Sequence, residues 1–259
     1  MKLNIVPART GATWVKLGIQ TFFKQPLALA GLFFMFMAVM SVVSLLPVIG
    51  FLLAMTLLPG VTLGLMAATR EATLGKFPMP TVLLAAFRAG KQQGRAMLTL
   101  GAMYAVGFMV ALGASWLVDG GDFARAYLGG GMPTDEILQD SAMPGALLVF
   151  MGLHLPLSFL FWHAPALVHW HGMSPAKSLF FSLVACLRNF RAMVLYFMSW
   201  MAVMVSVVLV VSMLAALTGN AALAGNLLFP ALMIVVSMFF TSLYFTFRDS
   251  FELAEAATT

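Results

Sequence analysis

Charged side chains are scarce in this chain, because Asp, Glu, Lys and Arg together make up only 9% of its 259 residues. An ordinary soluble domain is about a quarter charged and roughly half apolar, whereas 62% of these residues are hydrophobic and the mean hydropathy is +0.99. This composition excludes a soluble enzyme, a disordered tail and a nucleic-acid-binding module. It predicts an integral membrane protein whose partner is the lipid bilayer. We expect no nucleic-acid partner.

Cysteine is almost absent too, since Cys186 is the only one in the chain. A single thiol cannot form an intramolecular disulfide, and a metal site built from several cysteines is excluded as well. The sequence also lacks a Walker loop, an HExxH motif and a dinucleotide-binding glycine pattern. We therefore expect no metal, no cofactor, no catalytic residues and no enzymatic activity.

Long apolar runs take the place of the missing charges and define six expected membrane spans. Residues 25–69 carry no charge, and one helix of that length would measure about 67 Å, more than twice the ~30 Å hydrocarbon core of a bilayer. Pro47 and Gly50 indicate where this run folds back, because proline interrupts a helix. The six expected spans cover residues 27–46, 48–68, 96–118, 144–168, 192–217 and 223–247.

The distribution of charge orients these spans. Residues 119–143 hold five acidic side chains and a single basic one, Arg125, whereas the other thirteen Lys and Arg residues lie in the N-terminal arm, two connecting segments and the C-terminal tail. Cytoplasmic loops of membrane proteins are enriched in Lys and Arg. The pattern predicts that both termini lie in the cytoplasm and that residues 119–143 form an acidic loop on the opposite side of the membrane.

Three segments next to the spans have the pattern of an amphipathic helix: residues 10–24, 80–95 and 174–190. In the last of these, large apolar residues recur at helical spacing, while Lys177 and Arg188 fall mainly off that stripe. A basic face beside an apolar one favours a helix that lies in the membrane interface, where anionic headgroups attract it. The expected membrane-surface residues are Lys16, Lys24, Lys91, Arg95, Arg188 and Arg191.

These features predict an all-α protein in which one unit is used three times: a cytoplasmic amphipathic helix followed by a helical hairpin. A local repeat agrees with this unit. Pro59, Gly75, Pro78 and Lys91 recur as Pro156, Gly172, Pro175 and Arg188, each 97 residues later. The alternative is that prolines and glycines mark similar turns in any protein with several spans.

The candidates for a binding site or pathway are Pro59, Pro156, His154 and His163. Prolines inside a span, Pro165 included, kink the helix and free a backbone carbonyl, and transporters place binding sites at such discontinuities. An ionisable residue inside a membrane is a functional hypothesis by default. The plainer alternatives are prolines accommodated by neighbouring helices and neutral imidazoles that hydrogen-bond to them.

The chain also resembles a known group of proteins. The resemblance rests on the stretch from Pro47 to Gly75, on Ala164-Pro165-Ala166-Leu167-Val168, and on the later pairs Ser174-Pro175 and Arg188-Asn189. These segments are similar to uncharacterised six-span inner-membrane proteins of Gram-negative bacteria. Their layout is similar to the membrane domain attached to some glycerophosphodiester phosphodiesterases. Because the catalytic barrel of those enzymes is absent, the resemblance implies no activity. It implies a fold and a location, the bacterial inner membrane, with residues 119–143 as an acidic periplasmic loop.

The predicted function follows from what the spans contain. No Asp or Glu lies inside an expected span, which disfavours ion coupling through buried acids. Ser115 with His154 lacks an oxyanion-hole signature, and the scattered methionines are typical of packing rather than of a copper site. We predict a non-enzymatic scaffold, accessory or lipid-interacting protein that also contacts other membrane proteins. The alternative is a small-molecule transporter with its site at the kinked second and fourth spans.

Overall fold

The computed structural model describes residues 2–47, 49–129 and 142–251, which form helices joined by short turns, without a β-strand. Six helical stretches in these ranges are long and apolar enough to cross a membrane, which confirms the all-α class and the number of expected spans. They are α2 (Pro26–Ser44), α3 (Gly50–Thr73), α5 (Lys91–Asp119), the consecutive helices α8 (Met143–Trp162) and α9 (Ala164–His171), α11 (Phe190–Thr218) and α12 (Ala221–Ser250).

Shorter helices lie between these stretches. They are α1 (Thr10–Lys24), the 3-10 helix η1 (Pro80–Leu84), α4 (Ala85–Arg88), α6 (Asp122–Gly129) and α10 (Pro175–Arg188). Helices α1 and α10 occupy two of the three segments with an amphipathic pattern.

The third segment, residues 80–95, needs a correction because it is not one helix. It is divided into η1 and α4, and Gly90 then adopts a φ of 121°, a conformation that favours glycine over every other residue. Helix α5 starts directly afterwards, at Lys91. Lys91 and Arg95 therefore belong to the first two turns of a membrane-length helix rather than to a surface helix.

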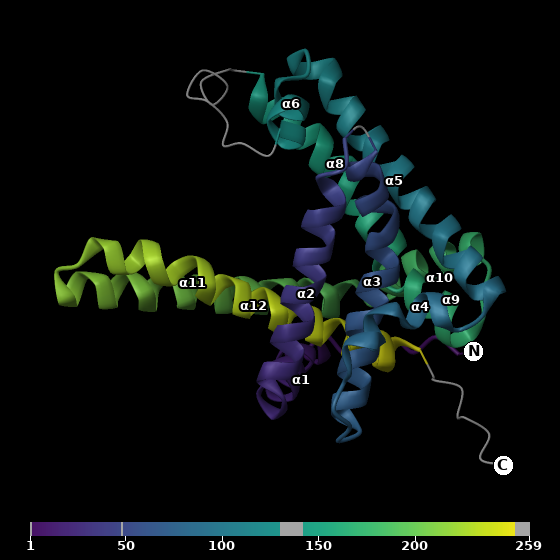
Figure 1. The fold of residues 1–259 in the computed structure, drawn as a ribbon, viewed down its shortest axis with the longest axis horizontal. Coiled ribbons are helices and arrows are strands. Elements are labelled where there is room, and N and C mark those ends of the chain that lie inside the picture. Colours follow the sequence, from purple (N-terminus) through teal and green to yellow (C-terminus); the bar gives the residue numbers. More distant parts are fainter. Residues whose placement is uncertain (1, 48, 130–141, 252–259) are drawn as a thin grey trace.

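The long helices pack in pairs that are consecutive in the chain: α2 with α3, α5 with α8, and α11 with α12. The shorter helices join these pairs, because η1 and α4 lie against α3, α10 lies against α8, and α1 lies against both α11 and α12. Figure 1 shows α11 and α12 projecting sideways from the rest of the molecule, while α5 and α8 rise toward its upper end. The first short helix is thus held by the last two long ones.

Helix α3 is packed more closely than the other spans, since half of its most apolar window is buried. A Cβ atom at Gly64 would lie 2.6 Å from the Cα of Leu83, and one at Gly101 of α5 would lie 1.8 Å from the carbonyl oxygen of Thr56. Both separations are shorter than any allowed contact, so only glycine fits. Small residues at such positions let helix backbones approach closely inside a membrane.

The fourth span is interrupted at His163, between α8 and α9. Pro165 follows two residues later and has no backbone N–H with which to continue the hydrogen-bond ladder of α8. A serine of α10 compensates for the break. Ser182 Oγ accepts a hydrogen bond from the His163 N–H (2.9 Å) and donates one to the carbonyl of Phe159 (2.8 Å).

The two ends of the described chain meet beside the junction of α10 and α11. Leu3 pairs with Phe251 in an isolated antiparallel β-bridge. The side chain of Asn189 holds the arm in place, because its Oδ1 accepts from the Val6 N–H (2.8 Å) and its Nδ2 donates to the carbonyl of Asn4 (3.0 Å). This amide is only 2% exposed, so it joins the N-terminal arm to the core.

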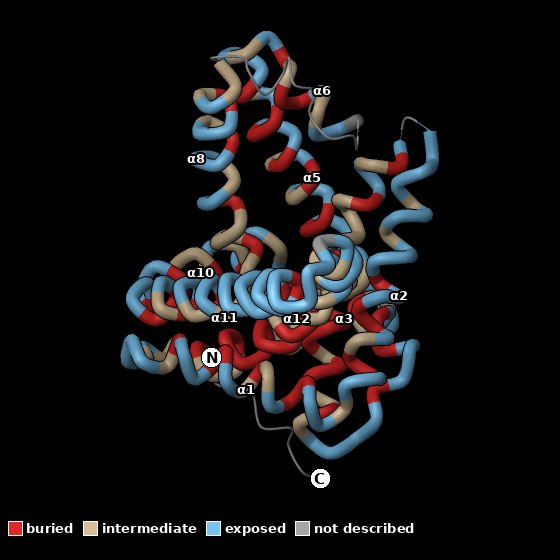
Figure 2. Tube along the Cα trace, turned by 90° about the vertical axis from the view of Figure 1, so that its left-hand side faces the viewer, coloured by how far each residue is buried: buried red, intermediate tan, exposed pale blue. Residues whose placement is uncertain are grey.

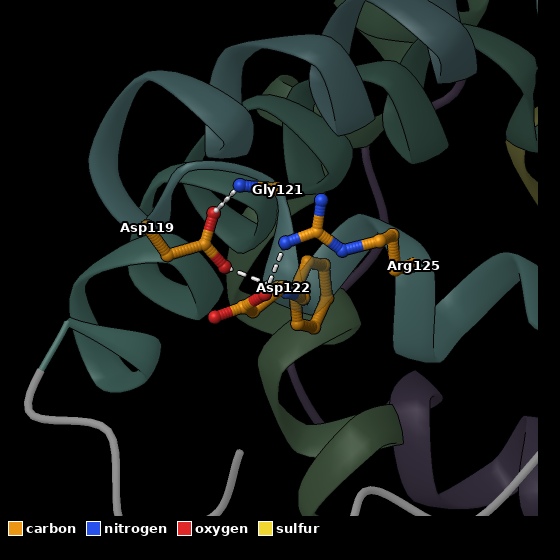
Figure 3. Close-up of polar contacts among 5 residues, drawn as sticks. Asp119, Gly121, Asp122 and Arg125 are labelled. Atoms are coloured by element: carbon orange, nitrogen blue, oxygen red, sulfur yellow. Dashed lines mark hydrogen bonds and ion pairs between the residues drawn. The ribbon is translucent and has the colours of Figure 1, made fainter.

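The acidic segment begins with a helix. Asp119 accepts hydrogen bonds from the backbone N–H groups of Gly121 (2.8 Å) and Phe123 (2.6 Å), so its carboxylate caps α6. Arg125, the lone basic residue of the segment, forms an ion pair with Asp122 (Figure 3). Most of the remaining expected loop lies outside the described residues.

Burial differs strongly from one pair of helices to the next. In Figure 2 buried positions gather in the region of α1 and α3, while the part of α11 nearest the viewer is exposed. Only 11% of the most apolar window of α11 is buried, against 50% in α3. Leu209, Leu217 and Phe229 are among the large apolar side chains exposed on α11 and α12. In a membrane, such side chains face lipid or another protein.

Candidate functional site

A cleft of about 180 Å³, here called the central cleft, lies where α3, α5, α8, α9 and α12 meet. Its lining residues are Leu58, Pro59 and Thr62 of α3, Tyr104 of α5, Ser158, Phe161 and Trp162 of α8, Pro165 of α9, and Phe239, Phe240 and Leu243 of α12. Four of the six membrane-length stretches therefore contribute to one site.

The lining of the central cleft is aromatic and aliphatic, and its polar groups are few. Ser158 Oγ donates to a carbonyl of its own helix (2.9 Å), and Trp162 Nε1 donates to Thr246 Oγ1 (3.1 Å). The Tyr104 ring packs edge-on against Phe161, with 5.0 Å between the ring centroids. The described lining holds no Asp, Glu, Lys, Arg or His. The cleft therefore suits an apolar ligand and offers no counter-ion to a charged one.

Of the four predicted pathway residues, the structure brings only Pro59 to the central cleft. Helices α3 and α8 both continue through their prolines, and Pro156 is exposed rather than part of the lining. His154 is stacked on Phe150, with 5.2 Å between ring centroids, and meets Phe108 edge-on. Its imidazole is thus one member of an aromatic cluster outside the cleft.

His163 lies in the core beside the only cysteine of the chain. The imidazole is 1% exposed, and its Nδ1 is 3.8 Å from Sγ of Cys186. Burial raises the pKa of the Cys186 thiol to about 12, so this group stays protonated at neutral pH. Because a thiolate is the reactive form of cysteine, the protonated Cys186 is unreactive, and we interpret the His163–Cys186 pair as a packing contact of the core.

Sequence reasoning missed the contribution of α12 to the site. Phe239, Phe240 and Leu243 lie in a continuous apolar run, where no residue type distinguishes one position from the next. They reach the cleft because α12 packs against α3, a long-range contact. Pro165 did carry a signal, since a proline that breaks a span was expected there, and it lines the cleft beside Trp162.

The six predicted surface cations, Lys16, Lys24, Lys91, Arg95, Arg188 and Arg191, are all exposed. Among the described residues the ion pairs are those of Arg125 and Arg248, with Asp122 and Asp249. None of the six predicted cations therefore has a carboxylate partner within the described ranges. We refer to the ends of the spans that carry these cations as the basic ends.

Six membrane-length helical stretches, four of which line an apolar cleft, are the structure of an integral membrane protein. The chain is 36% identical over 258 residues to a probable inner membrane protein of Burkholderia thailandensis, with 98% of this chain and 96% of that protein covered. It belongs to this family of inner-membrane proteins. No family model and no solved structure matches the chain. The layout similarity to phosphodiesterase membrane domains has no support among these findings and stays a prediction.

Proposed function

We propose that this protein is a non-enzymatic, lipid-interacting protein of the inner membrane whose central cleft takes an acyl chain of a phospholipid. The observation that carries the proposal is the aromatic and aliphatic lining of that cleft. In the proposed arrangement the three helix pairs are hairpins, the short helices lie on the cytoplasmic side, and both termini are cytoplasmic.

Charge supports this orientation. The six predicted cations, which have no carboxylate partner within the described ranges, lie at the basic ends, whereas Arg125 at the opposite end is paired with Asp122. Lys and Arg are enriched on the cytoplasmic side of membrane proteins. A reporter enzyme that is active only in the periplasm should give signal when it is inserted between α6 and α8, and none when it is fused after Thr259. The opposite pattern would reverse the proposed orientation.

Position along the helices supports an acyl chain as the ligand. Pro59 lies eleven residues before Arg70, and Tyr104 lies thirteen residues after Lys91, which correspond to about 16 Å and 20 Å along their helices. The hydrocarbon core of a bilayer is about 30 Å thick. The lining of the central cleft therefore reaches to about the middle of the membrane, a depth at which acyl chains surround the protein.

The same cleft fits a small polar solute poorly. A polar solute would leave hydrogen-bonding groups unpaired against the aromatic lining, at a cost of roughly 2–7 kcal/mol for each group. The polarity of the lining therefore favours the lipid over the transporter alternative.

The test is photo-crosslinking with a phospholipid that carries a diazirine near the middle of one acyl chain. We expect crosslinks on the peptides that contain Tyr104 and Trp162. Thr62→Phe fills the cleft and should remove most of these crosslinks. Leu148→Phe adds the same ring at a position that is 72% exposed on α8, and it should leave them unchanged.

Water access separates the lipid proposal from the transporter. Cys186 is 1% exposed, so Thr62→Cys introduces the only accessible thiol at the cleft. Under the lipid proposal this thiol is shielded from water, stays protonated and is not labelled by a membrane-impermeant maleimide. Rapid labelling by the impermeant reagent would show a water-filled cleft and would favour the transporter.

A further inference from the structure

A second cavity, separate from the central cleft, lies at the basic ends of the spans. It measures about 580 Å³ and is lined by residues 89–93, 96, 168 and 172–175. We call it the basic-end cavity. It is enclosed by the start of α5 on one side and by α9 and the turn into α10 on the other. Its volume lies within the usual range for small-molecule sites, about 300–1,000 Å³.

The polar side chains of the basic-end cavity are donors suited to an anion. Lys91 provides an ammonium group with three N–H donors, and Gln92 and Ser174 provide an amide and a hydroxyl. No Asp or Glu is among the described lining residues, and Lys91 has no carboxylate partner within the described ranges. An ammonium without a counter-ion in a concave site attracts anions.

The wall of the cavity is tied together by one side chain of α5. Gln93 Nε2 donates to the carbonyl of His169 on α9 (3.4 Å), which joins the two sides of the cavity. The backbone on which Lys91 sits is therefore positioned by a contact across the site. Charged residues near in sequence are also basic, since Arg95 lies four residues beyond Lys91 and Lys177 three beyond Ser174.

We propose that the basic-end cavity binds the phosphate group of a phosphate ester, with Lys91 as the counter-ion and with Gln92 and Ser174 as hydrogen-bond donors. Phosphate oxygens accept several hydrogen bonds at once, and a charged acceptor makes each of them stronger. The ester is either the glycerol-phosphate headgroup of an anionic phospholipid or a soluble glycerol phosphate. Only the lipid source rests on the proposed function.

The distance between the two sites agrees with a phospholipid as the source. Val168 of the cavity and Pro165 of the central cleft are three residues apart on α9, which is about 4.5 Å along the helix. On α5, Lys91 and Tyr104 are about 20 Å apart by the same measure. One leaflet of the hydrocarbon core is about 15 Å thick, so one lipid can place its phosphate in the cavity and a chain in the cleft.

The test measures binding to the full chain purified in a neutral detergent. Glycerol 3-phosphate is the soluble probe, glycerol is its control, and nanodiscs of phosphatidylglycerol in phosphatidylcholine are the lipid probe. Lys91→Gln should weaken binding of the phosphate-bearing probe about tenfold or more. Ala89→Trp, which fills the cavity and keeps the charge, should weaken it similarly. Lys16→Gln removes an exposed cation that does not line the cavity and should leave binding within about twofold.

Each result bears on the proposal. Retained binding in Lys91→Arg shows that the Gln variant lost a charge rather than its fold, and so supports the site. If Lys91→Gln weakens the binding of glycerol 3-phosphate alone, the ligand is a soluble ester. If it weakens the binding of phosphatidylglycerol alone, the ligand is the lipid headgroup. Equal losses in Lys91→Gln and Lys16→Gln, or no phosphate-dependent binding by either probe, overturn the proposal. Acyl-chain crosslinking in the central cleft is measured separately, so failure of the proposed function remains distinguishable.

Discussion

Helices α1 and α10 have the same amphipathic sequence pattern and use it in opposite ways. Helix α1 buries two of its three aromatic side chains, with Trp14 fully buried and Phe22 2% exposed, while Phe23 near its end is 64% exposed. Helix α10 buries small residues such as Ser182 and Cys186 instead, while Phe180 is 60% exposed. An amphipathic pattern therefore shows that a face needs an apolar environment, and the rest of the fold decides whether protein or lipid supplies it.

The cause of the difference is how closely each helix approaches its neighbours. Gly11 and Gly18 bring α1 so near that added Cβ atoms would lie 2.1 Å from the Ala192 carbonyl oxygen and 2.4 Å from Cβ of Ser242. The large side chains beside these glycines fit between α11 and α12. In α10 the fully buried positions are small residues such as Ser182 and Cys186, and the large side chains of Phe180 and Leu187 are exposed.

The largest expected effect is a difference in stability between variants of the apolar face of α1 and variants of the apolar face of α10. Trp14→Ala should destabilise the protein by about 3–5 kcal/mol, because it removes a fully buried ring and the Trp14 hydrogen bond to Asp249 (2.9 Å). Phe180→Ala on the outer face of α10 should cost less than about 0.5 kcal/mol. Unfolding of the purified variants in detergent measures both. Equal losses would mean that α10 is also covered by protein in the folded molecule.

A smaller effect tests the inner face of α10. Ser182→Ala should cost about 1–3 kcal/mol, because it leaves the His163 N–H without its acceptor and the Phe159 carbonyl with only the weak donor Sγ of Cys186 (3.8 Å). Ser178→Ala is the matched control, since Ser178 Oγ donates only to the Pro175 carbonyl of its own helix. If the two variants unfold at the same denaturant concentration, Ser182 does not hold the break together.

How much the sequence predicted depends on whether a feature is local. The spans and α1 and α10 follow from hydropathy and from a 3.6-residue period, which are local properties. The division of residues 80–95 was missed because it depends on the backbone conformation of Gly90. Proline marked the central cleft only in part, because Pro59 and Pro165 line it and Pro156 does not. The wall from α12 depends on long-range packing against α3, which no window of sequence contains.

A third prediction concerns the basic faces of the same two helices. Neutralising Lys16 and Lys24 in a synthetic peptide of residues 10–24 should weaken its binding to anionic vesicles by about 1 kcal/mol per lysine. A peptide of residues 174–190 should bind such vesicles and also neutral ones, since its large apolar face is the one left open in the protein. Helicity followed by circular dichroism measures this. An absence of helicity in the first peptide on anionic vesicles would remove the interfacial interpretation of α1.

The smallest expected effect on the folded protein uses the single thiol to compare the two faces of α10. Native Cys186 should resist a membrane-permeant maleimide at pH 8, because it is 1% exposed and burial raises its pKa to about 12. Phe180→Cys should label within minutes.

The same thiol gives the stability a pH dependence. Because the pKa of Cys186 is higher in the folded state, the protonated thiol favours folding at pH values below its pKa in the unfolded state, which is near 9. This contribution is lost as the pH rises from 9 to 12, where the unfolded thiol ionises first. Cys186→Ala should therefore lose less stability over that range than the native chain, and rapid labelling of native Cys186 would place it on the outer face.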